Sequence, residues 1–460
     1  MNFSIPKAWP SRRLLSIPNP LHQVRLSQTI ADNWLALNEL FGESKFSLST
    51  PLASLSRSRA VSRKFSFDQW SWLKFERSAG YRFVMRTDFS RFYQTIYTHS
   101  LPWAIHGKAR AKANKGNALY GNKLDACVRN TQDQQTIGLP VGPDTSFILS
   151  ELVGAEIDRA LAEQIPNLVG IRYVDDLSLY VETRAEAEAA YSSLARVAKQ
   201  FELELNEGKT SIFEGPDVGQ PAWKTVLHVF YVRKGGAQRA SLLSFIERAF
   251  ELAQLHRNQG VLAYAVKKLS AVELEETNAD LFEAFLRAAM MSDSDIIPTV
   301  LKVIFDRNAN GKLVYLDELF STLGRLAIQH ASARNDYEVA WTLWCYRVFE
   351  RPIPVKVQAA VSGQDNPIIA LVALECREQG IADELDTKVW EPALVAGNFY
   401  SENWLLTYEA ARRGWLVGDA YNELLSEPFF SQLHAYDVSF FEAPAGSGVD
   451  YISLSSSYTG

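Results

Sequence analysis

The sequence predicts an α+β protein in which a mixed first half precedes an all-helical second half. In the first half, a strand pattern ends at Asp88, and two apolar-alternating runs meet at Asp175-Asp176, as in a β-hairpin. Strand, helix, paired strands, helix and strand form a split β-α-β-β-α-β arrangement, which brings the ends of its central strands together. Beyond about residue 280 the pattern is helical and acidic.

Composition narrows the class of protein. The 460 residues, of which 47% are hydrophobic and 22% charged, are typical of a globular chain with two or three domains. Cys127, Cys345 and Cys376 lie far apart without metal-ligand spacing, so we expect neither a disulfide framework nor a zinc site, and a reducing cytosol. No apolar run is long enough to span a bilayer, and the N-terminus lacks an apolar signal core.

Charge is distributed unevenly along the chain. Residues 1–130 hold 20 Lys and Arg against 7 Asp and Glu, whereas the remainder holds 27 against 46. A basic front suggests that this region meets a polyanion such as DNA or RNA. In residues 57–86 the basic residues alternate with aromatic ones, which suits phosphate contacts and base stacking. The alternatives are a basic surface without a partner and aromatic side chains that belong to the core.

The adjacent carboxylates of Asp175 and Asp176 repel each other at the hairpin tip. A divalent cation is one reason for such an arrangement, because Mg²⁺ takes hard oxygen ligands; a solvated turn is the other. Asp88 stands at the mouth of a central strand, where it could join them in holding two ions, although an acid there also suits a helix N-cap.

Local signals place two helices. Thr183 and Glu186 form a capping box that predicts a helix from there to about residue 201. The tight Gly- and Pro-rich loop 136–146 precedes another helix, for which Thr145 or Ser146 is the expected cap. This loop lacks the Lys-Ser/Thr pair of a phosphate-binding P-loop, so the sequence excludes that class of ATPase.

Taken in chain order, these segments resemble a reverse transcriptase over about residues 1–235. The resemblance rests on Arg12-Arg13 before Ser16-Ile17-Pro18 (fingers), Asp88 to Tyr93 (motif A), Gly138 to Pro143 (motif B), Tyr173 to Asp176 (motif C) and Leu205 to Thr210 (motif D). It implies a right-hand polymerase with fingers, a palm built on a ferredoxin-like antiparallel sheet, and a thumb, followed by an all-α helical-repeat domain. The implied domains are residues 1–235 (fingers and palm), 236–285 (thumb-like helices), 286–445 (helical repeats) and 446–460 (a flexible tail).

The resemblance also implies site residues and a cofactor. Two Mg²⁺ ions, or Mn²⁺ in their place, are expected on Asp88, Asp175 and the backbone carbonyl of Phe89, with Asp176 as a third catalytic acid. The expected nucleotide-binding residues are Arg12, Arg13, Tyr93, Val141, Gly142 and Lys209. Among them Arg13 is the better fit to the triphosphate-gripping arginine, and the bulky Tyr93 would exclude ribonucleotides.

One residue departs from the family pattern. Val141 stands where many template-copying members carry Gln. The sequence from Leu139 to Ser146, together with Tyr97 to Ala104 and Gly107-Lys108, resembles bacterial abortive-infection and defence-associated reverse transcriptases. Some of these extend DNA without a conventional template from a protein hydroxyl, while others use a dedicated non-coding RNA. The expected partners are therefore dNTPs, DNA or RNA on the basic N-terminal region, a non-coding RNA and further copies of the chain, in a bacterial cytoplasm. Tyr451 and Tyr458 are candidate protein primers.

Two further readings stay open at this point. A retron-like enzyme that copies one defined RNA has the same motifs, and a non-catalytic nucleic-acid scaffold could retain the same fold. In the back half, similar helical segments start at residues 338, 368 and 404, which is a spacing typical of helical-hairpin repeats. An irregular helical domain is the alternative there.

Overall fold

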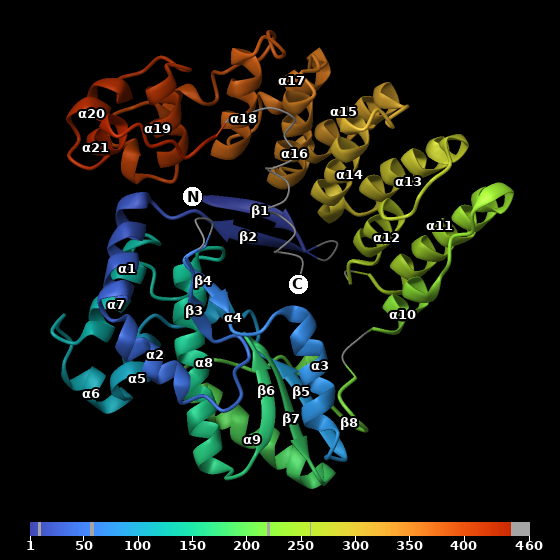
Figure 1. Cartoon of the computed structure of the whole chain (residues 1–460). Helices are drawn as coiled ribbons and strands as arrows, with labels where there is room; N and C mark the ends of the chain where they lie inside the picture. Colours follow the sequence, from blue (N-terminus) through green and yellow to red (C-terminus); the bar gives the residue numbers. More distant parts are fainter. Residues whose placement is uncertain (8–10, 56–58, 219–220, 258, 443–460) are drawn as a thin grey trace. The chain divides into compact units, whose positions relative to one another are not determined.

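The computed structural model describes residues 1–7, 11–55, 59–218, 221–257 and 259–442 (Figure 1). The chain forms two compact units. Residues 16–220 make up one, which we call the sheet unit. Residues 1–15 together with the chain from residue 221 onward make up the other, which we call the helical unit.

A four-stranded antiparallel sheet lies at the centre of the sheet unit. Its strands are β5 (Phe83–Asp88), β6 (Val169–Tyr173), β7 (Asp176–Val181) and β8 (Ser211–Glu214). They stand in the order β6-β7-β5-β8, which places β5 between β7 and β8. This is the order of a split β-α-β-β-α-β unit, in agreement with the arrangement predicted from the sequence.

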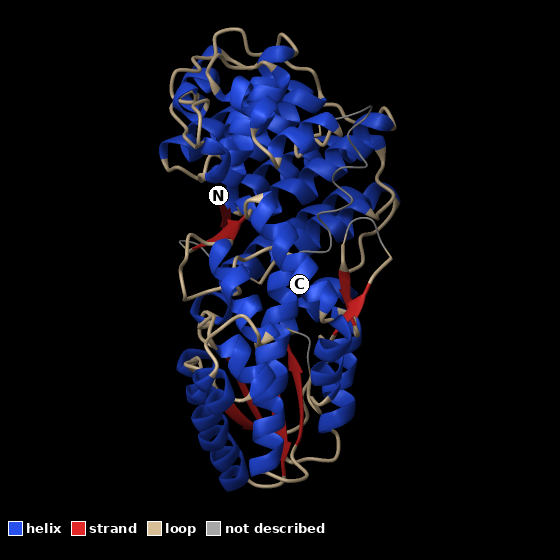
Figure 2. Cartoon of the chain, turned by 90° about the vertical axis from the view of Figure 1, so that its left-hand side faces the viewer, coloured by secondary structure: helices blue, strands red, loops and turns tan. Residues whose placement is uncertain are grey.

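Helices make up most of the rest of the sheet unit (Figure 2). They are α1 (Pro20–Asp32), α2 (Trp34–Gly42), α3 (Phe67–Ser78), α4 (Phe92–Thr95), α5 (Ser100–His106), α6 (Lys108–Ala113), α7 (Tyr120–Asn130), α8 (Asp144–Gln164) and α9 (Arg184–Gln200). A short pair of strands, β3 (Pro51–Ala53) and β4 (Val61–Arg63), and the 3-10 turn η1 (Glu207–Lys209) complete the unit.

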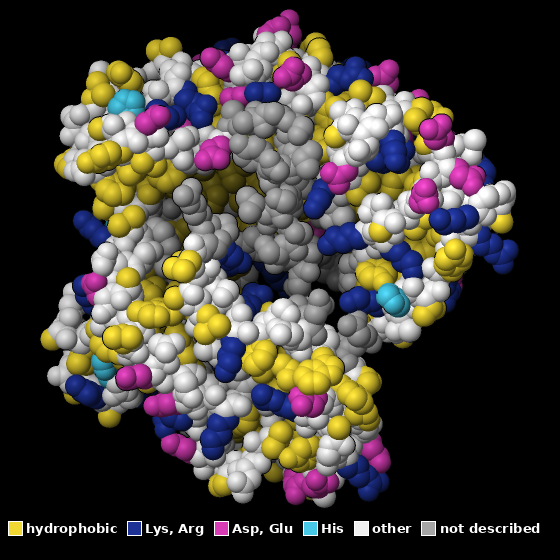
Figure 3. Space-filling model, viewed as in Figure 1, with side chains coloured by type: hydrophobic (Ala, Val, Ile, Leu, Met, Phe, Trp, Pro, Cys, Tyr) yellow, Lys and Arg dark blue, Asp and Glu magenta, His cyan; other side chains and the backbone are white. Residues whose placement is uncertain are grey.

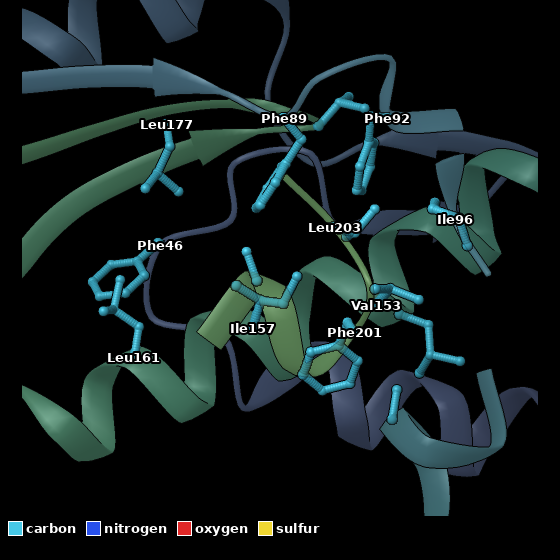
Figure 4. Packing of buried hydrophobic residues seen from close by; sticks show 14 of the residues in the cluster. Phe46, Phe89, Phe92, Ile96, Val153, Ile157, Leu161, Leu177, Phe201 and Leu203 are labelled. Atoms are coloured by element: carbon cyan, nitrogen blue, oxygen red, sulfur yellow. The ribbon is translucent and has the colours of Figure 1, made fainter. Parts of the chain in front are cut away.

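Different helices pack on the two faces of the sheet. Because side chains alternate along a strand, Leu177 and Asp176 point to opposite faces. Leu177 lies on the face toward α8, where Ile157 and Leu161 approach it and Phe89 (Figure 4). On the other face α3 packs against β6 and β7. The main hydrophobic core of this unit therefore lies beneath the sheet face that carries Leu177.

Of the two predicted helix starts, that of α9 agrees with the structure and that of α8 does not. The capping box of Thr183 and Glu186 is present at the start of α9, which confirms that prediction. The expected cap of α8 at Thr145 or Ser146 is wrong, because α8 already begins at Asp144, after Pro143. The Asp144 carboxylate, in the first turn, pairs with Arg59 and accepts the N–H of Ala60.

The helical unit contains a succession of helices after a short N-terminal sheet of β1 (Asn2–Pro6) and β2 (Arg12–Ser16). Its α-helices are α10 (Ala222–Val229), α11 (Gln238–Leu255), α12 (Val261–Ser270), α13 (Ala279–Ser292), α14 (Ile297–Ala309), α15 (Leu316–Ser332), α16 (Asp336–Val348), α17 (Val355–Val361), α18 (Pro367–Glu378), α19 (Trp404–Arg413), α20 (Ala420–Ser426) and α21 (Phe430–Ala435). Its 3-10 turns are η2 (Gly235–Ala237), η3 (Glu276–Asn278), η4 (Ser294–Ile296), η5 (Glu391–Ala393) and η6 (Asn398–Tyr400).

The three similar segments of the back half all lie in helices. They fall in α16, α18 and α19, and α18 contacts both of the others. That they form true repeats stays a prediction. In the described ranges we find no helix with the length and apolar character needed to cross a membrane.

The N-terminal strands belong to the helical unit because α16 holds them. Asp336 accepts the backbone N–H of Ser4 at 2.8 Å. Arg12 forms a bidentate ion pair with the fully buried Glu338, with N–O distances of 2.9 and 2.8 Å, and also donates to the Ser4 carbonyl. The compact units thus divide the chain differently from the expected domains, since residues 1–15 go with the helices and the sheet unit ends at residue 220, before the expected boundary at residue 235.

Folding also redistributes the charge. The sheet unit, residues 16–220, contains 23 Lys and Arg and 23 Asp and Glu, because later acidic residues join the basic front. Arg82 pairs with Glu214, and Arg86 with Asp217. On the face shown in Figure 3, Lys and Arg side chains lie among acidic ones over this unit. The surplus of positive charge along the sequence is therefore largely neutralised in the fold.

We predict that the Arg12–Glu338 pair stabilises the helical unit. Arg12→Ala leaves the Glu338 carboxylate buried without its bidentate partner, which should lower the free energy of unfolding by about 2 kcal/mol. The exposed neighbour Arg13 is the matched control, and Arg13→Ala should cost less than about 0.5 kcal/mol. Hydrogen exchange of the α16 amides in the full-length chain measures both effects, and equal protection in the two variants would contradict the prediction.

Candidate active site

A two-residue turn joins β6 to β7 and carries the first candidate acids. Val174 and Asp175 form the turn, and Asp176 is the first residue of β7. Tyr173 and Asp176 are paired across the hairpin, so their side chains share a sheet face. On that face the ring of Tyr173 stacks on Trp70 of α3, with centroids 5.1 Å apart. The predicted hairpin with acids at its tip is present.

Asp88 lies directly opposite this tip. It is the last residue of β5, and the β5–β7 register pairs it with Asp176. Its side chain is buried, and its Oδ1 atom makes no hydrogen bond in the described structure. Its Oδ2 atom accepts a hydrogen bond from the Lys209 ammonium group. The structure therefore brings Asp88, Asp175 and Asp176 together, as the sequence suggested.

Electrostatics at the tip favour a cation. Desolvation by the surrounding protein, and then repulsion from Asp175, raise the pKa of Asp176 to about 6. Asp88 raises this pKa further by a smaller amount, whereas Lys209 and Lys74 lower it. Burial lowers the pKa of Lys209, but the hydrogen bond and attraction to Asp88 outweigh this and raise it overall. Mutual repulsion of the three carboxylates is what a bound cation would relieve.

The residues present can accommodate a metal only with a rearrangement. In the part of the chain that the structure describes, no group of three or more His, Cys, Asp and Glu side chains is arranged to hold an ion. The Lys209 ammonium group is bonded to one carboxylate oxygen of Asp88, and it would have to move for a metal to use that oxygen. The Lys209 side chain is 62% exposed and can turn into solvent, which leaves the oxygens of Asp88 and Asp175 as hard ligands.

The backbone beyond Asp88 is fixed by the segment that carries Lys209. Asn206 donates its N–H to the Asp88 carbonyl at 2.8 Å, and Ser90 donates to the Glu204 carbonyl. Phe89 lies between these bonds, with its side chain buried and stacked on Phe92. The predicted role of Phe89 concerns its carbonyl oxygen, and stays a prediction.

Tyr93 is joined to the glycine-rich loop. Its hydroxyl accepts a hydrogen bond from Ser150 at 3.2 Å, and burial raises its pKa to about 12. The Tyr93 carbonyl accepts the N–H of Leu139 at 2.6 Å. Gly138, at φ +93°, allows this close approach, since a Cβ there would lie 3.2 Å from the Gln94 carbonyl oxygen.

The other end of this loop is also anchored. The Val141 carbonyl accepts the N–H of Ser16 at 2.8 Å. Gly142 follows at φ +129°, a conformation that only glycine adopts readily. Val141, Gly142 and Tyr93 therefore belong to one hydrogen-bonded assembly within the sheet unit.

The two candidate arginines lie in the helical unit. Arg12 is engaged by Glu338, so it would have to leave that carboxylate to contact a phosphate. Arg13 is exposed. The candidate primers Tyr451 and Tyr458 lie outside the described residues.

The basic and aromatic stretch 57–86 divides between interior and surface. Lys74 is buried, with its ammonium group 4.1 Å from the centre of the Trp70 ring, and burial lowers its pKa. Trp72 and Phe75 are exposed. The expectation that core packing accounts for part of this stretch agrees with the position of Trp70.

Sequence reasoning missed a buried ionic cluster beneath the hairpin. Arg172 of β6 is fully buried and pairs with Glu151 and Asp158 of α8, at 2.8 and 2.9 Å. A Cβ at Gly154 would lie 2.6 Å from the Arg172 guanidinium carbon, so glycine makes room for it. The signal was available: a lone arginine in an otherwise apolar strand, and two acids seven residues apart on an apolar helix face.

Comparison with known proteins identifies the family. The model of the family described as "Reverse transcriptase (RNA-dependent DNA polymerase)" matches residues 5–243, more than half of the chain. No curated protein matches the sequence. The matched domain implies a right-hand polymerase fold and RNA-directed DNA polymerase activity, which is a nucleotidyl transfer. With its paired acids on adjacent palm strands and its motifs in family order, the chain belongs to the reverse transcriptase family.

Proposed function

We propose that this chain is a Mg²⁺-dependent DNA polymerase that acts in bacterial anti-phage defence. The observation that carries the catalytic part is the pairing of Asp88 with Asp176, next to Asp175 at the hairpin tip. Three neighbouring carboxylates, with an exposed lysine bonded to Asp88, suit an exchangeable metal pair. The defence role is supported only by the resemblance of two stretches of sequence, residues 139–146 and 97–108.

In the proposed reaction a 3′-hydroxyl, or a protein hydroxyl at the first step, attacks the α-phosphate of a dNTP. The new P–O bond forms as the bond to pyrophosphate breaks. Asp88, Asp175 and the Phe89 carbonyl would hold the metals, with Asp176 as electrostatic support. Bound there, two Mg²⁺ or Mn²⁺ ions would stabilise charge on the attacking and leaving oxygens.

Other residues would handle the nucleotide and the leaving group. Lys209, which donates to Asp88, would give a proton to the departing pyrophosphate. Tyr93, held by Ser150, would exclude the ribose 2′-hydroxyl. Arg12 and Arg13 would steady the phosphates, with Arg13 favoured because Glu338 engages Arg12.

Val141 supports a particular form of this activity. Its apolar side chain lacks the donor and acceptor of the Gln that many template-copying relatives carry, which favours untemplated, protein-primed synthesis. Tyr451 and Tyr458 remain the candidate primers. Copying of a dedicated non-coding RNA, as in retrons, is the alternative, and a non-catalytic scaffold is the second alternative.

The same proposal includes location and assembly. We place the chain in the bacterial cytoplasm as a homo-oligomer that binds dNTPs and DNA or RNA. The free state of Cys127, Cys345 and Cys376 agrees with a reducing compartment.

The acids provide the first test. Asp88→Asn and Asp175→Asn should each lower dNTP incorporation by the purified chain at least about a thousandfold, because a lost metal ligand removes several kcal/mol of transition-state stabilisation. Asp133→Asn, at an exposed turn residue of the same unit, should leave the rate unchanged. If Asp175→Asn folds normally and cells keep the protein's function, the scaffold alternative replaces the polymerase.

Lys209 provides a test with two opposite signs. Lys209→Ala should lower the maximal rate about a hundredfold by removing the proton donor. It should also lower the Mg²⁺ concentration for half-maximal rate by about threefold, because the competing ammonium group is gone. Lys209→Arg keeps the positive charge, so its Mg²⁺ requirement should stay near that of the wild type. A rise in the Mg²⁺ requirement of Lys209→Ala would contradict this role.

Sequencing of the nucleic acid bound to the purified protein separates the forms of synthesis. Homopolymeric or random DNA attached to the chain is the expected result if synthesis is untemplated and protein-primed. A cDNA that matches one RNA would instead establish the retron-like alternative. Treatment with protease before sequencing tests whether the DNA is covalently attached.

A further inference from the structure

The backbone at the hairpin tip adopts a conformation that its residue disfavours. Val174, the first turn residue, has φ +58°, in the left-handed region. A β-branched residue rarely occupies this region, and glycine is the usual residue at such a turn position. Neighbouring groups must therefore hold the turn in place.

Two buried side chains form hydrogen bonds with the backbone of Val174, one with its N–H and one with its carbonyl. The Val174 N–H donates to the hydroxyl of Ser49 at 2.8 Å, and the Val174 carbonyl accepts from Arg172 at 2.9 Å. Glu151 closes the ring, because its Oε1 atom accepts from both Ser49 and Arg172 at 2.8 Å. Ser49 and Arg172 are fully buried, and Glu151 is 1% exposed.

The position of Ser49 is set by backbone pairing rather than by its own side chain. Phe46 and Leu48 both bond to the backbone of Arg172, through Arg172 N–H to Phe46 carbonyl at 2.7 Å and Leu48 N–H to Arg172 carbonyl at 2.8 Å. The Ser49 hydroxyl is thus delivered to the tip by a rigid neighbour. Its removal should leave the path of residues 46–48 unchanged.

We propose that Ser49 is a positioning residue for nucleotidyl transfer. Its hydroxyl, backed by Glu151 and Arg172, holds the Val174 peptide and so fixes the direction in which Asp175 and Asp176 point. This inference rests on the role of those acids in the proposed function. Small errors in the placement of reacting groups have large effects on rate. Greater mobility of the hairpin tip should therefore lower kcat.

Ser47 offers a matched control in the same segment. Its hydroxyl donates to Oε2 of Glu151 at 2.8 Å, just as the Ser49 hydroxyl donates to Oε1. The hydrogen bond to Val174 comes from the Ser49 position. Ser47→Ala and Ser49→Ala therefore each remove one donor from Glu151, but only Ser49→Ala releases the tip.

The first experiment compares these two variants as full-length proteins. Ser49→Ala should lower the urea unfolding midpoint more than Ser47→Ala, because it also leaves the buried Val174 N–H without its acceptor. Ser49→Ala should lower kcat at least about tenfold with KM for dNTP within about twofold, whereas Ser47→Ala should keep kcat within about twofold of the wild type. Equal losses of kcat in the two variants, or a loss confined to KM, would overturn the proposal.

A rescue experiment tests the strain directly. Glycine adopts φ +58° readily, whereas alanine does not. In the Ser49→Ala background, Val174→Gly should therefore recover at least about threefold in kcat over the Ser49→Ala single variant. Val174→Ala, which removes the same branched side chain without freeing the backbone, should recover nothing. Equal recovery by the two substitutions would count against a strained turn.

A readout independent of activity separates this inference from the proposed function. In the chain without nucleotide, Ser49→Ala should speed hydrogen exchange of the 172–178 amides at least about tenfold, and Ser47→Ala should not. Unchanged exchange refutes the clamp. If exchange accelerates but the wild-type chain incorporates no nucleotide, the proposed function fails while the clamp on Val174 stands. Accelerated exchange with unchanged kcat rejects the positioning role.

Discussion

The antiparallel pairing of β5 with β7 is the constraint on which the candidate site depends. Asp88 and Asp176, far apart in the sequence, become neighbours because β5 pairs with β7 in a register that aligns their ends. The same strand end bonds to Asn206, which brings Lys209 to Asp88. A slip of one residue would turn Asp88 to the other sheet face, into the core. One register thus fixes the acids and their counter-charge together.

The two sides of the palm sheet manage charge by different means. On the core side, Arg172 is permanently matched by Glu151 and Asp158, all of them buried. Loss of any one partner would leave an uncompensated buried charge, so this cluster is fixed. On the active-site side, the cation bonded to Asp88 is Lys209, whose side chain is mostly exposed, and the buried Lys74 adds a smaller attraction to Asp176. A fixed ionic cluster around Arg172 on one side of the sheet, and the movable Lys209 on the other, are suited to a site that admits a metal and a charged substrate while the sheet keeps its shape.

The sequence predicted the features that depend on neighbouring residues, and it missed those that depend on contacts between residues far apart in the chain. The hairpin, the strand end at Asp88 and the capping box of α9 follow from periodicity and neighbouring residues, and the fold contains all three. The partner of Arg12 is Glu338, far along the chain, and no local pattern encodes that contact. For Arg172 the sequence marks an arginine and two acids in apolar surroundings, but it does not show that they meet. The charge asymmetry along the sequence is smaller in the fold for a related reason: acids from later segments pair with basic residues of the front, as Glu214 does with Arg82 and Asp217 with Arg86.

The loop around Val141 shows why the question of template can be separated from that of fold. Its path is set by backbone bonds: Leu139 N–H to the Tyr93 carbonyl, and Val141 carbonyl to the Ser16 N–H. Neither bond involves the Val141 side chain, so valine and glutamine could follow the same path there. The departure from the template-copying pattern therefore removes a hydrogen-bonding group without requiring a change of shape. If synthesis is untemplated, as proposed, the choice of nucleotide has to come from a group in another part of the chain or from a partner.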